Sequence, residues 1–393
     1  MIYDAIIIGA GPAGSMTAKI LAERGNDVLL IEKQEVPGNN IHCAGGLIGK
    51  ILERLNILKE LKKSDSIKSD IRKIKFCSPN NTAIIDLRRT IGHILDRKSF
   101  DRCLANIACK NGAKLVLNTR FHSINIFGNE ISIKVKKDNN FEILKTRVLV
   151  GADGIKSLVA KEAGIFIKSK YLGYGYGYDV DGLSNIEHDQ IEVYFSNFTP
   201  GGYTWIFPKG EQYANFGAGG IKGNNFYYKR IFHYFKNRYK KTAYKLKNIS
   251  KIRFTGGIVP VSSPPRSCIR GNVLLVGDAA NQINSTTAEG IRFSLICGKV
   301  AGLTINYALK NDINFLKKYN VIWRQILGRE VMFSRIAREF FLRFNNSDYD
   351  IIIEAIKKLD FGNIMKGKWL LTLIDIIFKT PKVIKLMRNR LRS

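Results

Sequence analysis

The sequence has few cysteines, and their spacing excludes several kinds of metal centre. Six cysteines are spread over 393 residues, and no two of them form a C-x-x-C pair. Zinc ribbons and iron–sulfur clusters are usually built on such closely spaced thiolates, so we expect no metal site. Scattered single cysteines are typical of a reducing compartment, and we therefore expect a cytoplasmic protein.

Acidic residues are also scarce. The 33 Asp and Glu residues stand against 63 Lys and Arg residues, which gives a formal net charge of +30. Such a surface attracts anionic lipid headgroups or phosphorylated substrates, although a lysine-rich proteome would give the same composition. The pattern of a nucleic-acid-binding module is missing, and we expect no nucleic-acid partner.

Long uncharged apolar runs and a signal-peptide pattern are missing as well, so we predict neither a bilayer-spanning helix nor secretion. The stretch from Lys366 to Ser393 is apolar at first and basic after Pro381, with eight basic residues against one acidic residue. This composition suits an element lying on the anionic inner face of a membrane, as in a peripheral membrane protein. A helical cap packed on the protein's own core explains it equally well.

The first 32 residues carry the pattern of a nucleotide-binding β-α-β unit. We expect a buried strand over residues 3–8, a helix over 13–24 and a second buried strand over 28–31. The intervening turn reads G-x-G-x-x-G: Gly9 permits the tight turn, Gly11 lets the backbone approach a pyrophosphate, and Gly14 lets helix and strand pack closely. Glu32 ends the second strand and can accept hydrogen bonds from a ribose. These features predict a dinucleotide site at the helix N-terminus.

Three later segments resemble the signatures of FAD enzymes of the hydroxylase-like branch. They read LDRKSFD at 95–101, GADGIKS at 151–157, and GDAA at 277–280 followed by AEGI at 288–291. The resemblance implies that FAD is the cofactor, that Asp278 binds its ribityl chain, and that Arg97 lies near the flavin or its linker. It also implies that a helix beginning near Gly290 points its positive end at the flavin. The predicted cofactor-binding residues are Gly9, Gly11, Ala13, Gly14, Glu32, Lys33, Arg97, Asp153, Gly154, Asp278, Ala279, Gly290 and Ile291.

A second G-x-G-x-x-G is missing, so we expect no dedicated NAD(P)H domain. The electron donor must then be an external molecule that visits the flavin. NAD(P)H, a ferredoxin and a deazaflavin all remain open.

An alternating aromatic stretch, PGGYTWIFPK, occupies residues 200–209. On a strand, Tyr203, Trp205 and Phe207 share one face and form an aromatic wall about 13 Å long. If the strand carrying Gly217 and Gly219 pairs with this wall, the missing side chains would leave a slot for a long, thin apolar ligand. Core packing of an amphipathic strand is the alternative.

The spacing Y-x-W-x-F-P, eight residues, G-x-G resembles the lipid-contact motif of the geranylgeranyl reductase family, which includes archaeal digeranylgeranylglycerophospholipid reductases. The resemblance covers roughly residues 1–310, and a further family feature is matched by Cys43-Ala44-Gly45-Gly46. Two departures are Ser285, where the family often has Pro, and Ala288-Glu289-Gly290 in place of a glycine triplet. The implied substrate-binding residues are Tyr203, Trp205, Phe207, Pro208, Gly217 and Gly219.

The family resemblance implies that Cys43 lies near the flavin and takes part in catalysis. A free cysteine is more often simply a small buried side chain, and that alternative remains. Cys43 and Tyr203 are both candidate proton donors to the substrate, together with flavin-bound water. The sequence does not choose among them.

We therefore expect an α/β fold: a Rossmann-type FAD-binding domain of the glutathione-reductase-like class, hydroxylase-like branch, with an inserted β-rich substrate domain and a C-terminal helical region. The FAD-binding domain is assigned residues 1–70, 90–165 and 266–310, the substrate domain 71–89 and 166–265, and the helical region 311–393. Within these, we expect helices over 49–63, 97–111 and 288–309, paired strands over 71–87, and mostly β-structure over 114–150 and 171–254.

The resemblance implies an FAD-dependent oxidoreductase that acts on CH–CH bonds, saturating the C=C bonds of geranylgeranyl chains in membrane lipids or their precursors. An FAD-dependent monooxygenase or epoxidase on the same fold is the first alternative. A non-catalytic isoprenoid- or flavin-binding protein is the second.

Overall fold

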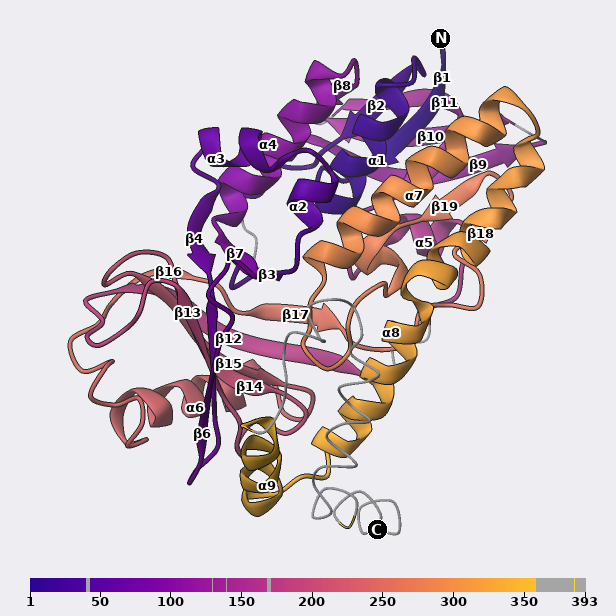
Figure 1. Cartoon of the computed structure of the whole chain (residues 1–393). Helices are drawn as coiled ribbons and strands as arrows, with labels where there is room; N and C mark the ends of the chain where they lie inside the picture. Colours follow the sequence, from indigo (N-terminus) through magenta and orange to yellow (C-terminus); the bar gives the residue numbers. More distant parts are fainter. Residues whose placement is uncertain (40–42, 129, 139, 168–170, 358–384, 386–393) are drawn as a thin grey trace.

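The structure is a computed structural model that describes the chain except for residues 40–42, 129, 139, 168–170, 358–384 and 386–393. It consists of three β-sheets with helices packed around them (Figure 1). Apart from Lys385, the basic stretch predicted to touch a membrane lies outside the described residues.

The first sheet carries the N-terminal strand at its centre. Its order is β18-β19-β11-β1-β2-β8, and β1 is parallel to both of its neighbours. An antiparallel meander of β9 and β10 continues from β11. Residues 5–8 and 28–31 are buried throughout, as expected of parallel strands covered on both faces. The strands are β1 (Ile2–Ile8), β2 (Val28–Ile31), β8 (Lys114–Val116), β9 (Thr119–Phe127), β10 (Glu130–Lys137), β11 (Asn140–Gly151), β18 (Ile269–Arg270) and β19 (Val273–Leu275).

Helices α1 (Pro12–Ala22) and α7 (Ile291–Lys310) pack closely beside this sheet (Figure 1). Two glycines of α7 make the approach possible. A Cβ at Gly298 would lie 2.6 Å from the carbonyl oxygen of Ala13, and one at Gly302 would lie 2.6 Å from Ile20 Cβ. Helix α4 (Arg97–Lys110) packs on the other side of α1.

The second sheet has the order β16-β12-β15-β14-β13-β5-β6, with β17 also paired to β12. Helix α6 (Asn225–Asn237) covers one face with Tyr228, Ile231, Phe232 and Phe235. The other face looks toward the first sheet (Figure 1). The strands are β5 (Lys73–Cys77), β6 (Thr82–Asp86), β12 (Leu172–Asp181), β13 (Gln190–Tyr194), β14 (Tyr203–Pro208), β15 (Ala214–Gly220), β16 (Ser250–Phe254) and β17 (Gly257–Pro260).

A small third sheet, in the order β3-β7-β4, lies between the two large ones (Figure 1). Its strands are β3 (Gly46–Ile48), β4 (Ile67–Ile71) and β7 (Gly92–Leu95). The remaining elements are α2 (Ile51–Arg54), α3 (Leu58–Lys63), α5 (Leu158–Glu162), α8 (Tyr319–Phe341), α9 (Asn346–Ile356) and the 3-10 helices η1 (Gly277–Ala280) and η2 (Ile313–Lys318). Helix α9 docks on the β5–β6 turn, where Asp350 accepts hydrogen bonds from Ser78 and Asn80.

The expected fold class is confirmed, but two expected elements are wrong. The helix predicted over 49–63 is broken at Asn56, whose φ of 53° is left-handed and ends α2 before α3 begins. The segment predicted as β-structure contains α6, because the aromatic residues of 225–237 repeat at helical spacing and bury one face. The domain boundaries stay a prediction, although strands from both predicted substrate segments share the second sheet.

Candidate active site

A cavity of about 560 Å³ opens at the carboxyl ends of the central strands of the first sheet. Its lining comes from segments far apart in the sequence. The lining includes residues that follow β1, β2, β11 and β19, the first turn of α7, the start of β9, and Ile258 and Val259 of β17. In doubly wound folds, this crevice is where nucleotide cofactors bind.

The glycine turn after β1 forms a bare cradle at one wall of the cavity. Gly9 has a φ of 104°, and a Cβ there would lie 2.4 Å from the carbonyl oxygen of Ala152. A Cβ at Gly14 would lie 1.9 Å from the Gly9 carbonyl oxygen, so this position too requires glycine. At Gly11, by contrast, nothing lies within 4 Å of the Cβ position, which opens to the cavity. The open backbone before the first turn of α1 fits a pyrophosphate.

Glu32 stands at the same wall and is already held in place. Its Oε2 accepts a hydrogen bond from the backbone N–H of Ala10 at 2.8 Å, and its Oε1 accepts one from Gln34 at 3.0 Å. Each carboxylate oxygen has a second lone pair available. The residue can therefore accept hydrogen bonds from a ribose without moving.

Asp278 faces the cavity from the first turn of η1. A Cβ at Gly290 would lie 3.2 Å from its Oδ1 atom, so the carboxyl group abuts the start of α7. Burial raises the pKa of Asp278, and the positive charge of Arg97 offsets part of this rise. Among the described residues, the carboxyl group has no hydrogen-bond partner. A half-buried carboxyl group left without partners in a cavity fits a ligand rich in hydroxyl groups, such as a ribityl chain.

Arg97 begins α4, where the Asp96 side chain caps the helix by accepting from Ser99 N–H at 2.9 Å. Its guanidinium group forms a two-point ion pair with buried Asp101, both contacts at 2.9 Å. Burial lowers the pKa of Arg97, but Asp101 and Cys43 together raise it above the ordinary arginine value. Arg97 therefore remains charged at the cavity wall.

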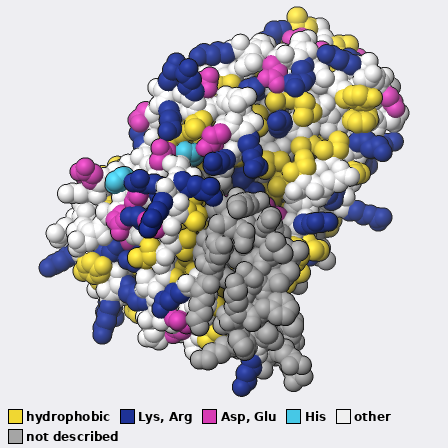
Figure 2. All heavy atoms as spheres, in the orientation of Figure 1, with side chains coloured by type: hydrophobic (Ala, Val, Ile, Leu, Met, Phe, Trp, Pro, Cys, Tyr) yellow, Lys and Arg dark blue, Asp and Glu magenta, His cyan; other side chains and the backbone are white. Residues whose placement is uncertain are grey.

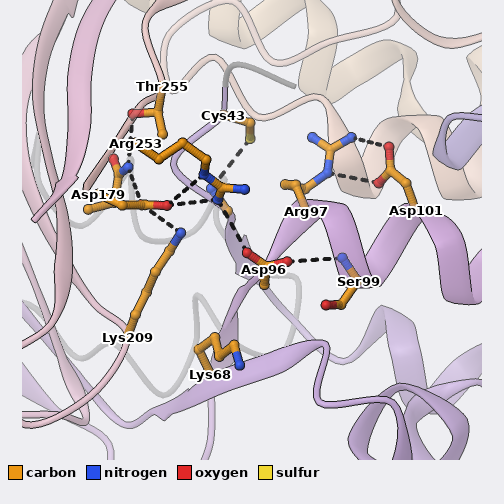
Figure 3. A network of polar contacts seen from close by, with 12 residues as sticks. Cys43, Lys68, Asp96, Arg97, Ser99, Asp101, Asp179, Lys209, Arg253 and Thr255 are labelled. Atoms are coloured by element: carbon orange, nitrogen blue, oxygen red, sulfur yellow. Dashed lines mark hydrogen bonds and ion pairs between the residues drawn. The ribbon is translucent and has the colours of Figure 1, made fainter. Parts of the chain in front are cut away.

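Cys43 also lines the cavity. It is half-buried, and its sulfur accepts a hydrogen bond from Gly45 N–H at 3.4 Å. Cys43 and Arg97 both line the cavity and are drawn near each other in Figure 3. The structure therefore brings Cys43, Arg97 and Asp278 to one cavity.

Asp153 and Gly154 lie on the cavity wall, but the Asp153 carboxylate is used locally. It accepts hydrogen bonds from Ser157 Oγ at 2.6 Å and from Leu158 N–H at 2.8 Å, at the N-terminus of α5. This is a helix-capping arrangement. Gly154 has open space at its Cβ position and leaves room for a ligand.

Of the predicted cofactor-binding residues, Gly14 and Ala279 do not line the cavity, and the other eleven do. Gly14 packs against Gly9, and Ala279 is buried in η1. The sequence analysis missed Thr119, Arg120 and Phe121, which reach the cavity from the start of β9. No motif marks them, because their position depends on the meander that follows α4.

The aromatic strand β14 lies in the second sheet as predicted. Tyr203, Trp205 and Phe207 are half-buried on one face, whereas Pro208 points with Ile206 to the opposite, buried face. Strand β15 pairs with β14 so that Tyr203 is opposite Gly219 and Trp205 is opposite Gly217.

The expected open slot at the glycines is wrong, because the indole of Trp205 fills it. A Cβ at Gly217 would lie 2.4 Å from Trp205 Cζ2, and one at Gly219 would lie 3.4 Å from Cζ3. Gly175 of β12 continues this floor, with its Cβ position 3.7 Å from Cη2. The wide, flat ring therefore rests on backbone, and the surface offered to a ligand is the other face of the indole.

Two contacts join the aromatic wall to the cavity. The Phe207 ring lies over Gly46, where a Cβ would be 2.8 Å from Phe207 Cε2, and Gly46 is three residues beyond Cys43. The Tyr203 hydroxyl donates a hydrogen bond to the carbonyl oxygen of Thr287, which lies shortly before α7. The wall and the cavity are thus neighbours in the structure, because Cys43 and Ala288, which line the cavity, lie close in sequence to Gly46 and Thr287.

The Rossmann sheet, the bare glycine cradle and the free Asp278 carboxyl group define an FAD-dependent flavoprotein. A family model described as an FAD binding domain matches residues 2–215, and a geranylgeranyl reductase catalytic domain matches residues 174–259. A digeranylgeranylglycerophospholipid reductase of Methanosarcina acetivorans is 33% identical, over 97% of this chain and 94% of that protein. One from Methanococcoides burtonii is 32% identical, over 98% and 94%. The chain belongs to the geranylgeranyl reductase family and is an oxidoreductase acting on C=C bonds.

Solved structures agree on the fold. A geranylgeranyl bacteriochlorophyll reductase-like protein from Thermoplasma acidophilum superposes with a TM-score of 0.88 at 24% identity, covering 99% of both chains. The myxobacterial chondrochloren halogenase, described as a variant of FAD-dependent halogenases, has a TM-score of 0.73 at 16% identity, over 86% of this chain and 83% of that one.

Proposed function

We propose that this protein saturates the geranylgeranyl chains of glycerophospholipids or of their precursors at the aromatic wall of β14. One observation supports the proposal: the wall contacts segments next to the cavity lining, through Phe207 on Gly46 and through Tyr203 at Thr287, the residue before Ala288 of the lining. An apolar chain lying along the wall would therefore meet the flavin edge. The glycerophospholipid reductases that this chain resembles over nearly its full length support the same substrate class.

The cofactor is FAD, and the residues of the cavity suit each of its parts. We assign the pyrophosphate to the turn at Gly11, a ribose to Glu32, the ribityl chain to Asp278, and the flavin ring to the region of Cys43 and Arg97. The positive end of α7 beyond Gly290 faces the same region. When bound and reduced by the external donor, the cofactor would supply the hydride, which carries both electrons, and a second group would supply the proton for reduction of the double bond.

The aromatic wall helps the reaction by excluding water and by presenting π-faces to the chain. An isolated trisubstituted alkene develops positive charge when proton transfer runs ahead of hydride transfer. The faces of Trp205 and Phe207 stabilise such charge, and in a dry site this effect is stronger than in water.

Tyr203 and Cys43 are the candidates to give the proton. Burial raises the pKa of Tyr203, and the neighbouring Cys43 and Glu289 raise it further. The hydroxyl therefore stays protonated at physiological pH. The hydroxyl donates its hydrogen bond to the Thr287 carbonyl oxygen, so this hydrogen bond must break before Tyr203 can donate to substrate.

We further infer that an external donor delivers electrons to the flavin and that the protein works at an anionic membrane surface. Figure 2 shows Lys and Arg side chains spread over the visible face, in keeping with the charge of +30. Within the described ranges, every helix is too short or too polar to cross a bilayer. A basic surface would hold the protein beside its lipid without insertion.

The test is anaerobic turnover. The purified protein, loaded with FAD, is mixed with dithionite and a geranylgeranyl glycerophospholipid, and the lipid is followed by mass spectrometry. We expect a gain of two hydrogen atoms for each reduced bond, and reoxidation of reduced flavin by the lipid. A strict requirement for oxygen, with oxygen incorporated, would indicate a monooxygenase. Reduced flavin that the lipid leaves unchanged would indicate a carrier.

A further inference from the structure

The plane of the Trp205 indole is fixed at two points. One face of the ring rests on the backbone at Gly217 and Gly175, as described above. In addition, Nε1 donates a hydrogen bond to Oδ1 of Asn215 at 2.7 Å. Asn215 lies on β15 two residues before Gly217, on the same face of the strand, so its amide meets the edge of the ring.

The amide of Asn215 is itself held in one orientation. It is fully buried, and its Nδ2 donates to Asp179 Oδ1 at 2.8 Å and to Thr255 Oγ1 at 2.9 Å. Both N–H bonds of the amide are therefore used. Only Oδ1 remains to face the indole, because a flipped amide would place its oxygen against the Asp179 carboxylate.

Asp179 is the fully buried centre of this network (Figure 3). Lys209 donates to Oδ1 at 2.8 Å, and Arg253 donates to Oδ2 through Nε at 3.0 Å and Nη2 at 2.7 Å. Burial raises the pKa of Asp179, but Lys209, Asn215 and Arg253 lower it below its ordinary value, so the carboxyl group is ionised. Buried ion pairs add little net stability compared with well-packed apolar residues. Their place directly behind the aromatic wall points to a positional role.

The network continues to the flavin side of the molecule. Arg253 also contacts Asp96 at 3.2 Å, and Asp96 caps α4 through Ser99. The next residue, Arg97, lines the FAD cavity beside Cys43 (Figure 3). A continuous series of polar contacts thus connects the indole to the helix end at the cofactor site.

We propose that Asn215 and Asp179 are positioning residues that set the plane of Trp205 relative to the flavin, and so decide which double bond of the isoprenoid chain is reduced. The inference rests on the proposed function, since it takes the wall as the binding surface for the chain. Asn215 acts through the indole and touches no substrate.

A double-mutant cycle tests this role. Asn215→Leu removes the acceptor while keeping the volume, and Trp205→Phe removes the indole N–H while keeping an aromatic ring. The FAD-loaded variants and the double variant are compared for kcat, KM and the distribution of partly reduced lipids. We expect Asn215→Leu to lower kcat/KM roughly three- to tenfold, the value of one hydrogen bond, and to change which partly reduced products accumulate.

The double variant distinguishes a positioning role of Asn215 from a role in stabilising the fold alone. If Asn215 acts through Trp205, the double variant is no worse than Trp205→Phe alone. If the two losses multiply, or if Asn215→Leu equals the wild type, the positioning role is wrong. Flavin reduction by dithionite should stay unchanged in every variant.

Two further arms keep the proposal testable. Should Asn215→Leu fail to fold, Thr255→Val removes one acceptor of the amide and should shift products in the same direction, while Thr255→Ser should restore them. Should the wild type leave the lipid unreduced, the proposed function fails on its own. The environment of the indole is then measured by fluorescence. The emission spectrum of Trp205→Phe is subtracted from that of the wild type, and the spectrum of the double variant from that of Asn215→Leu, which leaves the emission of Trp205 in each background. A Trp205 emission that Asn215→Leu leaves unaltered would overturn the inference.

Discussion

The hydroxyl of Tyr203 donates a hydrogen bond to the carbonyl oxygen of Thr287 at 2.6 Å. This contact links the aromatic strand of the second sheet to the loop before α7, whose first turn lines the FAD cavity. The proposed cofactor cavity and the aromatic wall are therefore close together, and we expect variants in the two places to have separable effects.

Asp278→Ala should weaken FAD retention, because the carboxyl group is assigned to the ribityl chain. Loss of a charge-assisted hydrogen bond of about 1.5–3 kcal/mol predicts a Kd roughly ten- to a hundredfold higher. The measurement is the flavin absorbance that remains after gel filtration. Asp350→Ala is the matched control: it removes a carboxylate that accepts hydrogen bonds from Ser78 and Asn80 away from the cavity, and it should leave FAD retention unchanged. Equal FAD retention by Asp278→Ala and wild type would contradict the assignment.

Trp205→Ala should impair lipid reduction and leave the flavin spectrum nearly unchanged, because the indole is part of the aromatic wall and does not line the cofactor cavity. Truncation of a large aromatic residue costs about 3–5 kcal/mol of stability, so thermal unfolding is measured alongside. Trp323→Ala, in the helical layer, is a control for aromatic truncation elsewhere. Full activity in a folded Trp205→Ala variant would argue against the wall.

Cys43→Ala should slow alkene reduction more than it slows flavin reduction by dithionite, because the thiol lies beside Arg97 at the cavity and is a candidate proton donor. Stopped-flow absorbance gives both rates. Cys109→Ala, at the end of α4, serves as the cysteine control and should behave as wild type. If Cys43→Ala does likewise, Cys43 is a packing residue.

Acid should destabilise the wild type more steeply than an Asp179→Asn variant. The pKa of Asp179 is lowered in the folded protein, so its stabilising contribution is present above the unfolded value, near 3.8, and is lost as pH falls through the folded value. The variant is less stable at neutral pH, because Lys209 and Arg253 lose their buried partner. The free energy of unfolding is measured in urea from pH 6 to as low as folding persists. If the free energies of unfolding of the wild type and of Asp179→Asn fall in parallel with pH, the lowered pKa of Asp179 is wrong.

Binding to anionic liposomes should depend on the basic C-terminal stretch, each basic residue contributing about 1 kcal/mol at the surface. The full chain and a version ending near Thr380 are sedimented with liposomes at low and high salt. We expect the full chain to pellet at low salt only. A full chain that stays in the supernatant, or a truncation without effect, would leave the stretch as a structural cap.

Local patterns predicted the nucleotide-binding half of the fold well. The strand at 28–31 and helix α4 depend on short-range periodicity and capping chemistry, and each occurs as expected. Helix α6 was missed because its many aromatic residues favour strands by intrinsic preference, while burial of one face against the second sheet favours a helix.

The candidate site shows the same division. Residues within motifs, such as Gly9 and Asp278, could be assigned from their spacing. The network of Asn215, Asp179 and Arg253 could not, because its members come from three strands and only sheet register brings them together. The slot was wrong for a related reason: glycines predict free space, but whether a neighbour fills it depends on the facing strand.

The strand order of the first sheet has a consequence for how the protein folds. Strand β1 pairs with its near neighbour β2, but its other partner is β11, and β11 pairs in turn with β19, so the sheet is completed only by strands that lie far apart in the sequence. Such long-range pairing slows folding. The cavity also needs the segment around Asp278, which lies far from the glycine turn in the sequence. Cofactor capture must therefore follow the pairing of strands that are distant along the chain, and it depends on the slowest part of folding.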